Sequence, residues 1–298
     1  MTNSEKTGTP DRTAELTPEQ RSRLMNRHGE ERIALTIKTY AAHVRQRRML
    51  QLRVHLVQAA IFILFMGIWE LAGRMKWLNV LLFSYPSKIV RLLASMAEDG
   101  TLWPHLGMTV SETVIGFVLG TVCGTLLAVL LWWSPFIEKV LDPYIVVLNS
   151  MPKVALGPLF IVGLGPGMLS IIGTTLAVTV IITTLVVFSS FREVDANYVK
   201  VVRLFGGSRP QVFYKVILPA AYPSIVSTLK VNVGLAWIGV IVGEFLVSEK
   251  GLGYLIVYGF QVFNFTLVIG SLFLIAIVAA VMYQIVAWVE RKLLKGKR

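Results

Sequence analysis

Six long apolar stretches divide this chain, and only short polar segments separate them. The stretches cover residues 56–72, 106–133, 140–162, 168–191, 221–246 and 265–289. A bilayer core about 30 Å thick needs roughly 20 apolar residues of α-helix, and the stretches are close to that length or longer. The composition agrees, because 55% of the 298 residues are hydrophobic and only 15% are charged. The sequence therefore predicts an all-α membrane protein with six transmembrane helices.

The net charge of +12 is better explained by membrane orientation than by nucleic-acid binding. Basic residues cluster before the first stretch, between the fourth and fifth, and after the sixth, which by the positive-inside rule places both termini in the cytosol. Residues 1–30 have no apolar segment typical of a signal peptide and predict a disordered cytosolic tail. Residues 31–53 predict an amphipathic interfacial helix. Residues 54–298 are then the six-span domain.

The sequence lacks the motifs that are typical of several kinds of binding and catalytic site. Cys123 is the single cysteine and cannot form an internal disulfide, and the four histidines show no metal-binding spacing. The chain has no phosphate-binding Gly-x-x-x-x-Gly-Lys-Ser/Thr loop, zinc-protease helix or Gly-x-Ser-x-Gly elbow. We therefore expect no enzyme activity, no metal and no cofactor bound by this chain.

The polar, basic segment 192–219 predicts a short helix between the fourth and fifth stretches. Asp195 can cap its start, and Gly206-Gly207 can end it with a left-handed residue. Lys200 and Arg203 fall on other faces from an apolar stripe made of Tyr198, Val201, Val202 and Phe205. A helix of about a dozen residues is marginal alone in water, so the stripe needs a partner surface.

This segment resembles the membrane permease subunits of binding-protein-dependent ABC importers. Their coupling motif is Glu-Ala-Ala, then a Gly four residues later, then Ile-x-Leu-Pro beginning ten residues after that Gly. Gly206, Leu218 and Pro219 match the spacing. The chain departs from the motif by having other residues where Glu, Ala, Ala and Ile are expected: Lys200, Val201, Val202 and Val216. A salt bridge made by that Glu is therefore lost, whereas docking on the ATPase remains expected.

The resemblance extends over residues 69–292. NSMPKVALGPLFIVGLGPG (149–167) looks like the third-span signature of the nitrate, sulfonate and taurine branch, and SEKGLGYLI (248–256) looks like its loop before the last span. The resemblance implies an importer in the bacterial plasma (inner) membrane with two copies of the permease, expected as a homodimer, two ABC ATPase subunits that bind ATP and Mg, and an external substrate-binding protein. It also implies a small, anionic solute and alternating access.

Ionisable residues inside apolar stretches are candidates for the translocation path, because burying a charge in a membrane is costly. The deepest are Glu112, Asp142, Lys153, Lys230 and Glu244. Lys153 follows Pro152 at a predicted helix break, and Lys153 and Lys230 could both attract an anion in a central cavity. The alternative is that each lysine pairs with a carboxylate such as Glu112 or Glu244, or extends to an interface. Glu244 is expected near the outer interface.

Three glycines in the second stretch, Gly116, Gly120 and Gly124, repeat every four residues. This spacing lets two helix backbones approach closely, either at a subunit seam or within one chain.

A second functional class also stays open. An ion-coupled secondary transporter would use Glu112, Asp142 or Lys153 as a proton or ion relay. That class gives the basic segment 192–219 no role, and co-purification of an ATPase distinguishes it from an importer.

Overall fold

The computed structural model describes residues 46, 47 and 49–295, and every regular element in this part of the chain is a helix. The all-α prediction is thus confirmed. The chain divides into two units, residues 1–68 and 69–298. The predicted tail 1–30 and most of the predicted interfacial helix 31–53 lie outside the described residues.

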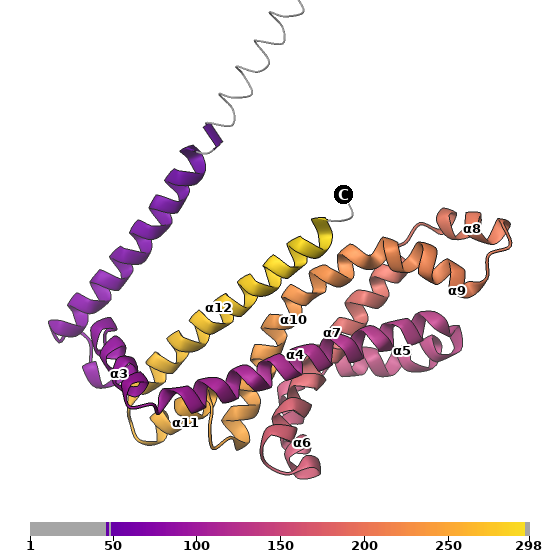
Figure 1. The fold of residues 1–298 in the computed structure, drawn as a ribbon. Coiled ribbons are helices and arrows are strands. Elements are labelled where there is room, and N and C mark those ends of the chain that lie inside the picture. Colours follow the sequence, from indigo (N-terminus) through magenta and orange to yellow (C-terminus); the bar gives the residue numbers. More distant parts are fainter. Residues whose placement is uncertain (1–45, 48, 296–298) are drawn as a thin grey trace, which may run out of the picture. The chain divides into compact units, whose positions relative to one another are not determined.

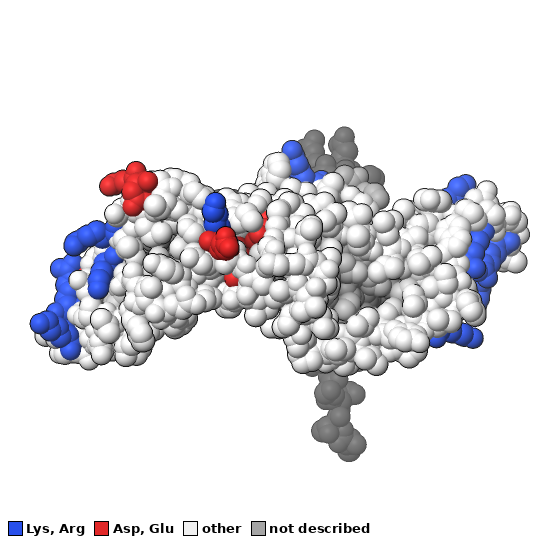
Figure 2. All heavy atoms as spheres, turned by 90° about the horizontal axis from the view of Figure 1, so that it is seen from below, with Lys and Arg blue, Asp and Glu red and all other residues white. Residues whose placement is uncertain are grey.

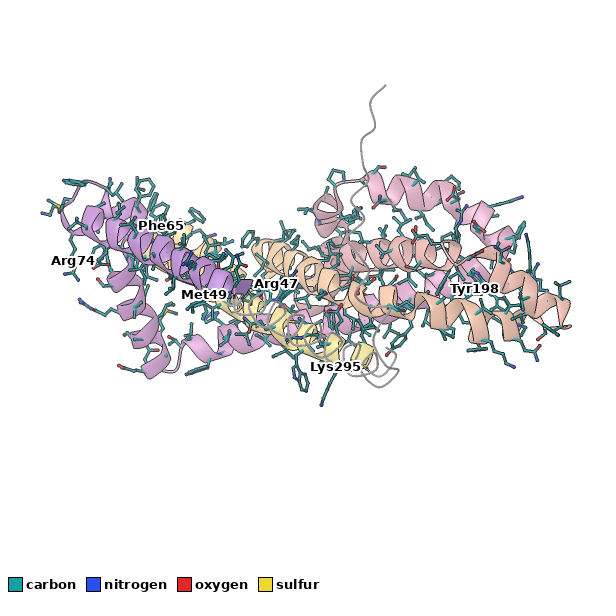
Figure 3. All side chains as sticks on the ribbon, turned by 90° about the horizontal axis from the view of Figure 1, so that it is seen from above. Arg47, Met49, Phe65, Arg74, Tyr198 and Lys295 are labelled. Carbon is teal, nitrogen blue, oxygen red and sulfur yellow. The ribbon has the colours of Figure 1, made fainter. Side chains whose placement is uncertain are left out.

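The first described helix, Met49–Arg74, is long and apolar enough to cross a bilayer. It begins inside the segment assigned to the interfacial helix and continues past residue 53 without a break. The apolar side chains of residues 49–68 are mostly exposed, and Phe65, for example, is 60% exposed (Figure 3).

The second unit contains four more helices of spanning length. These are α4 (Leu102–Trp133), α7 (Met168–Arg192), α10 (Leu218–Val247) and α12 (Phe265–Lys295). Two short elements, α9 (Arg209–Val212) and the π-helical turn η2 (Phe213–Ile217), join α10 without a break, so that 39 residues form one helix. The predicted second, fourth, fifth and sixth spans are therefore present, each somewhat longer than its apolar stretch.

The predicted third span is a bent pair of helices. α5 (Pro135–Ser150) meets η1 (Lys153–Leu156) and α6 (Gly157–Leu164) at 99°. Pro152 lies at this break with extended backbone, and it has no N–H with which to continue the helix. The described residues thus contain five spanning helices, or six if the bent pair counts as one broken span.

α7 lies between α4 and α10 and forms the centre of the second unit (Figure 1). Glycines of α4 face threonines of α7 at each turn of the contact. A Cβ atom added to Gly116 would lie 2.5 Å from Thr175 Cγ2, and Cβ atoms at Gly120 and Gly124 would meet Thr179 and Thr183 at least as closely. The glycine repeat therefore brings together two helices of one chain. The backbones can approach because these positions carry no side chain.

Short helices cover the ends of the long ones. α2 (Val80–Phe83) and α3 (Pro86–Glu98) precede α4, and α8 (Ala196–Leu204) lies between α7 and α9. The segment predicted as a loop before the last span instead contains α11 (Leu252–Gln261), which packs on α10 and α12. We call the part of the bundle near α8 the α8 end and the part near α11 the α11 end.

Candidate functional site

The short helix α8 forms where the sequence predicts it. The Asp195 carboxylate accepts a hydrogen bond of 2.8 Å from the Asn197 N–H and caps the first turn. After the last turn, Gly206 has a φ of +77°, and its N–H donates to the Arg203 carbonyl at 2.9 Å. Glycine suits this position because a Cβ atom disfavours a left-handed backbone. The helix therefore has a defined start and stop.

The two faces of α8 have different surroundings. Val199 and Val202 pack against a buried cluster that includes Phe191 and Phe213. The prediction that Val202 shares one apolar stripe with Tyr198, Val201 and Phe205 is wrong, because Val202 packs inward with Val199. The exposed large apolar side chains are Tyr198 (64%), Val201 (50%), Leu204 (86%) and, at the C-cap, Phe205 (88%). We call these four residues the α8 plate.

Basic residues surround the α8 plate. Lys200 and Arg203 are exposed on the same short helix. In Figure 2 most of the visible surface carries no charge, and blue basic side chains gather in two main groups, one of them over the α8 end at the right; Figure 3 labels Tyr198 in the same region. An apolar plate with a basic border fits an apolar groove that has acidic groups at its rim.

The segment that follows α8 packs against the long helices. The Arg209 guanidinium donates to the Trp132 carbonyl at 3.0 Å and lies 5.5 Å from the Trp132 ring centre. Phe213 packs between Trp132 and Phe191, with ring centres 4.9 and 5.7 Å away. These contacts connect the segment after α8 to both α4 and α7. A force on α8 would therefore act on the bundle.

Leu218 and Pro219 lie inside the continuous helix 209–247, which begins before the predicted fifth stretch at residue 221. Proline has no N–H for the carbonyl four residues earlier and crowds that carbonyl. The π-helical turn Phe213–Ile217 directly precedes it, and the Leu218 N–H donates to the Phe213 carbonyl five residues back. This wider turn lets the helix continue through the proline.

Lys230 forms an ion pair within the bundle. Its Nζ lies 2.9 Å from Glu290 Oε2, and the Ser227 hydroxyl donates to Glu290 Oε1 at 3.0 Å. The pairing alternative considered for Lys230 therefore applies, with Glu290 as partner in place of Glu112 or Glu244.

We expect Lys230→Met to lower the thermal midpoint of unfolding by a few degrees, because it leaves the nearly buried Glu290 without its counter-charge. The double variant Lys230→Met/Glu290→Leu should restore most of that loss. A thermal scan of the detergent-solubilised chain measures both. If the double variant were less stable than the single one, the pair would not be the reason for the loss.

Lys153 lies at the bend after α5. Its Nζ donates to the Asn149 carbonyl at 2.8 Å, in the last turn of that helix, and the residue is half-buried. Cations are favoured at helix C-termini, so this contact stabilises the end of α5. Asp142 is exposed on α5.

Glu112 and Glu244 lie next to each other in the interior. Their side chains are 0% and 1% exposed. Glu244 lies in the last turn of α10, and residues 251–253 fold over it and bury it. Its position near the outer interface stays a prediction. The candidate residues for the translocation path therefore do not form one site. The two glutamates form a buried pair, Lys230 pairs with Glu290, and Lys153 contacts the C-terminal end of α5.

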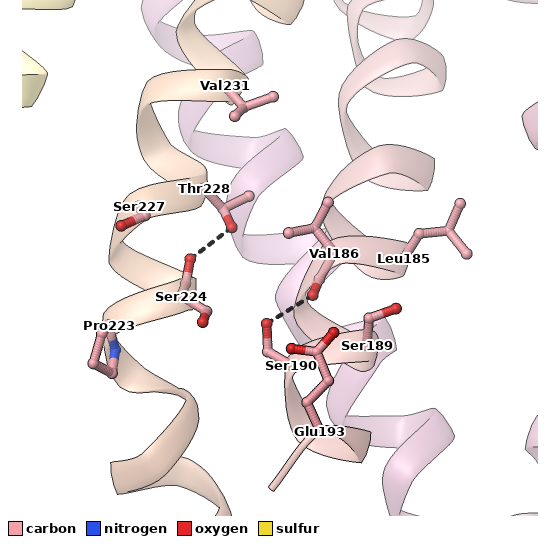
Figure 4. Close-up of a pocket in the computed structure, with 10 residues that line it drawn as sticks. All are labelled: Leu185, Val186, Ser189, Ser190, Glu193, Pro223, Ser224, Ser227, Thr228 and Val231. Atoms are coloured by element: carbon pink, nitrogen blue, oxygen red, sulfur yellow. Dashed lines mark hydrogen bonds between the residues drawn. The ribbon is translucent and has the colours of Figure 1, made fainter.

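A groove lined by both hydroxyl groups and apolar side chains, which the sequence did not predict, lies between α7 and α10 near the α8 end (Figure 4). Its volume is about 600 Å³. Hydroxyl groups from both helices line it: Ser189, Ser190, Ser224, Ser227 and Thr228. Ser190 and Thr228 donate to carbonyls of their own helices, whereas the Ser189 and Ser224 hydroxyls have no hydrogen-bond partner among the described residues. The spacing of Ser224, Ser227 and Thr228 at i, i+3 and i+4 was the available sequence signal.

The chain matches the family described as "Binding-protein-dependent transport system inner membrane component" over residues 116–295. A Bacillus subtilis protein named as an aliphatic sulfonates transport permease is 31% identical over 78% of this chain and 84% of its own length. The formylaminopyrimidine transport permease ThiX of Halalkalibacterium halodurans is 32% identical over 65% of this chain and 76% of its own. The structure of a bacterial alginate ABC transporter in complex with a periplasmic protein shares the fold, with a TM-score of 0.57, 14% identity, and 80% and 95% of the two chains covered.

Proposed function

The chain belongs to the family of binding-protein-dependent transport system inner membrane components, and from this membership we propose that it forms the translocation path of an ATP-driven ABC importer. In this proposal two copies of the chain assemble as a homodimer with two ATPase subunits and an external substrate-binding protein. ATP and Mg²⁺ bind to the ATPase. Both termini and the α8 end lie in the cytosol, as the basic residues of segment 192–219 and of the C-terminus favour.

The α8 plate is the observation that carries the proposal. Three large apolar side chains of the nine-residue helix α8 and the Phe205 side chain at its C-cap remain exposed in the isolated chain, although the other face of that helix is packed. We infer that the plate docks in a groove of the ATPase. When ATP closes the ATPase pair, α8 moves, and its contacts through Arg209 and Phe213 transmit the movement to α4, α7 and α10. The bundle then alternates between outward and inward access as a rigid-body movement.

The groove between α7 and α10 supplies a polar surface for the solute. Its Ser189 and Ser224 hydroxyls are available to donate hydrogen bonds to the oxygens of a sulfonate-like anion. Glu193, at the C-terminal end of α7, is the charged residue of the lining and disfavours tight retention of an anion. Weak binding suits a path that the solute must leave. The names of the relatives span sulfonates and a formylaminopyrimidine, so we assign selection of the solute mainly to the binding protein.

We expect the double variant Ser189→Ala/Ser224→Ala to reduce uptake roughly fivefold or more, because it removes two hydroxyl donors worth about 0.5–1.5 kcal/mol each. ATPase activity of the reconstituted complex should stay within about twofold of the parent. Ser111→Ala is the matched control, since Ser111 is exposed on α4 and outside the groove. Unchanged uptake in the double variant would remove the groove from the path.

Reconstitution tests the function itself. The chain purified from native membrane should carry an ABC ATPase, and liposomes with the complex should take up a sulfonate only with ATP and binding protein. Uptake by this chain alone under an ion gradient would support a secondary transporter and contradict the proposal.

A further inference from the structure

A hydrogen-bonded cap at the α11 end has no role in the proposed coupling. Three consecutive backbone N–H groups at the start of α11 donate to side chains of two other helices. The contacts are Gly251 to His105 Nδ1 (3.0 Å), Leu252 to Thr109 Oγ1 (2.8 Å) and Gly253 to Glu244 Oε2 (2.6 Å). Because the first turn of a helix has no acceptors of its own for these groups, α4 and α10 cap α11 from outside.

The two glycines of this turn allow the carboxylate to come close. A Cβ atom at Gly253 would lie 2.7 Å from Glu244 Oε2, and one at Gly251 would overlap the same carboxyl group. Gly251 also has a φ of +130°, which other residues rarely adopt. Glycine at positions 251 and 253 therefore leaves room for the Glu244 carboxyl group against the start of α11.

Glu244 is well supplied with hydrogen-bond donors. The Thr109 hydroxyl donates to Oε1 at 2.6 Å, and the Gly253 N–H donates to Oε2. The positive end of the α11 dipole also faces this carboxyl group. These contacts stabilise a negative charge on Glu244.

The surroundings of Glu112, in contrast, do not stabilise a negative charge. It lies on α4 next to Glu244, its side chain is fully buried, and neither carboxyl oxygen has a hydrogen-bond partner among the described residues. A buried carboxylate without donors or a counter-charge is costly, and two adjacent carboxylates that are both ionised cost more. A protonated Glu112 avoids both costs, because its O–H can donate to Glu244.

We propose that Glu112 and Glu244 share one proton, carried on Glu112, and that this proton fastens the start of α11 to α4 and α10. In the capped state Glu112 donates to Glu244, which accepts from Thr109 and Gly253. When Glu112 loses the proton to water, two carboxylates face each other, and their repulsion weakens the contact between Glu244 and Gly253. The cap at the α11 end therefore loosens as the pH rises.

Few other ionisable groups face this pair. His105 on α4 accepts through Nδ1, so the capped state requires that nitrogen to be unprotonated, and its ring stacks on Tyr254 of α11 at 5.8 Å. Glu249 and Lys250 lie in the exposed turn before α11. Along the helices packed nearby, α7 has no ionisable side chain before Arg192 and α12 has none before Tyr283.

Infrared spectroscopy of the full chain in lipid nanodiscs tests for the proton. A protonated buried carboxyl group has a C=O stretching band separate from those of carboxylates and amides. We expect the parent protein to show this band near neutral pH, Glu112→Gln to lack it, and Glu112→Asp to retain it. Absence of the band from the parent, or its persistence in Glu112→Gln, would overturn the proposal.

Hydrogen exchange of the peptide 248–256 tests the cap. After correction for intrinsic exchange, we expect protection in the parent to fall at least about tenfold from about pH 6 to about pH 9. Glu112→Gln should keep its protection across that range, because the amide still donates to Glu244. Thr109→Val removes one acceptor of the cap and should lower protection at every pH. Equal pH dependence in the parent and Glu112→Gln would contradict the proposal, whatever the transport activity.

Discussion

Phe205→Glu should abolish coupled transport while leaving the chain folded in the membrane. Phe205 is the most exposed residue of the α8 plate, at 88%, and its side chain supports no buried cluster of the described bundle. Removing an aromatic anchor from a protein interface and adding a charge costs about 2–4 kcal/mol, which weakens binding roughly 30-fold or more. We expect the ATPase to dissociate on purification, and ATP-dependent uptake in liposomes to fall to background.

Two substitutions on the same helix control this result. Phe205→Tyr keeps a large ring and should retain most of the uptake. Val202→Glu places a charge on the packed inner face, against the cluster that contains Phe191 and Phe213, and should lower the amount of folded protein as well as transport. If Phe205→Glu transported normally with its ATPase attached, the α8 plate would not be the docking surface.

Gly120→Leu should prevent stable packing of the bundle. A Cβ atom at Gly120 would already overlap the Thr179 hydroxyl, so a leucine must push α4 away from α7. Overpacking of this kind costs about 3 kcal/mol or more when backbones have to move. We expect little monodisperse protein by size-exclusion chromatography and a strongly lowered thermal midpoint for what remains.

Gly107→Leu is the matched control for that substitution. Gly107 lies on the same helix, α4, and a Cβ atom there would meet nothing within 4 Å. The change to a better helix former should leave the yield unchanged or raise it. Equal damage from both substitutions would mean that α4 tolerates no leucine at either glycine, and the tight α4–α7 contact would not be the cause.

The relatives' names agree with the family that short motifs indicated. Gly206, Leu218 and Pro219 carry the spacing of the coupling motif although Lys200, Val201, Val202 and Val216 replace its other members. The structure explains how such a divergent motif keeps its shape. The helix stop depends on the backbone of Gly206, and the continuation into α10 depends on the π-helical turn before Pro219.

Sequence alone determined the features that depend on local chemistry. Long apolar stretches give spanning helices because a bilayer leaves backbone groups no other partners, and the caps of α8 follow from Asp195 and Gly206 through contacts within a few residues. The α4 glycine spacing indicated a close helix contact, although the partner helix could not be read from the repeat.

Only the tertiary structure decided which distant side chains meet. It paired Lys230 with Glu290, 60 residues later, and turned Val202 inward. It also brought Glu112 and Glu244 together beneath the start of α11, although 132 residues separate them in the chain. Such contacts depend on how helices rotate and cross when they pack, which the periodicity of each helix taken separately does not specify.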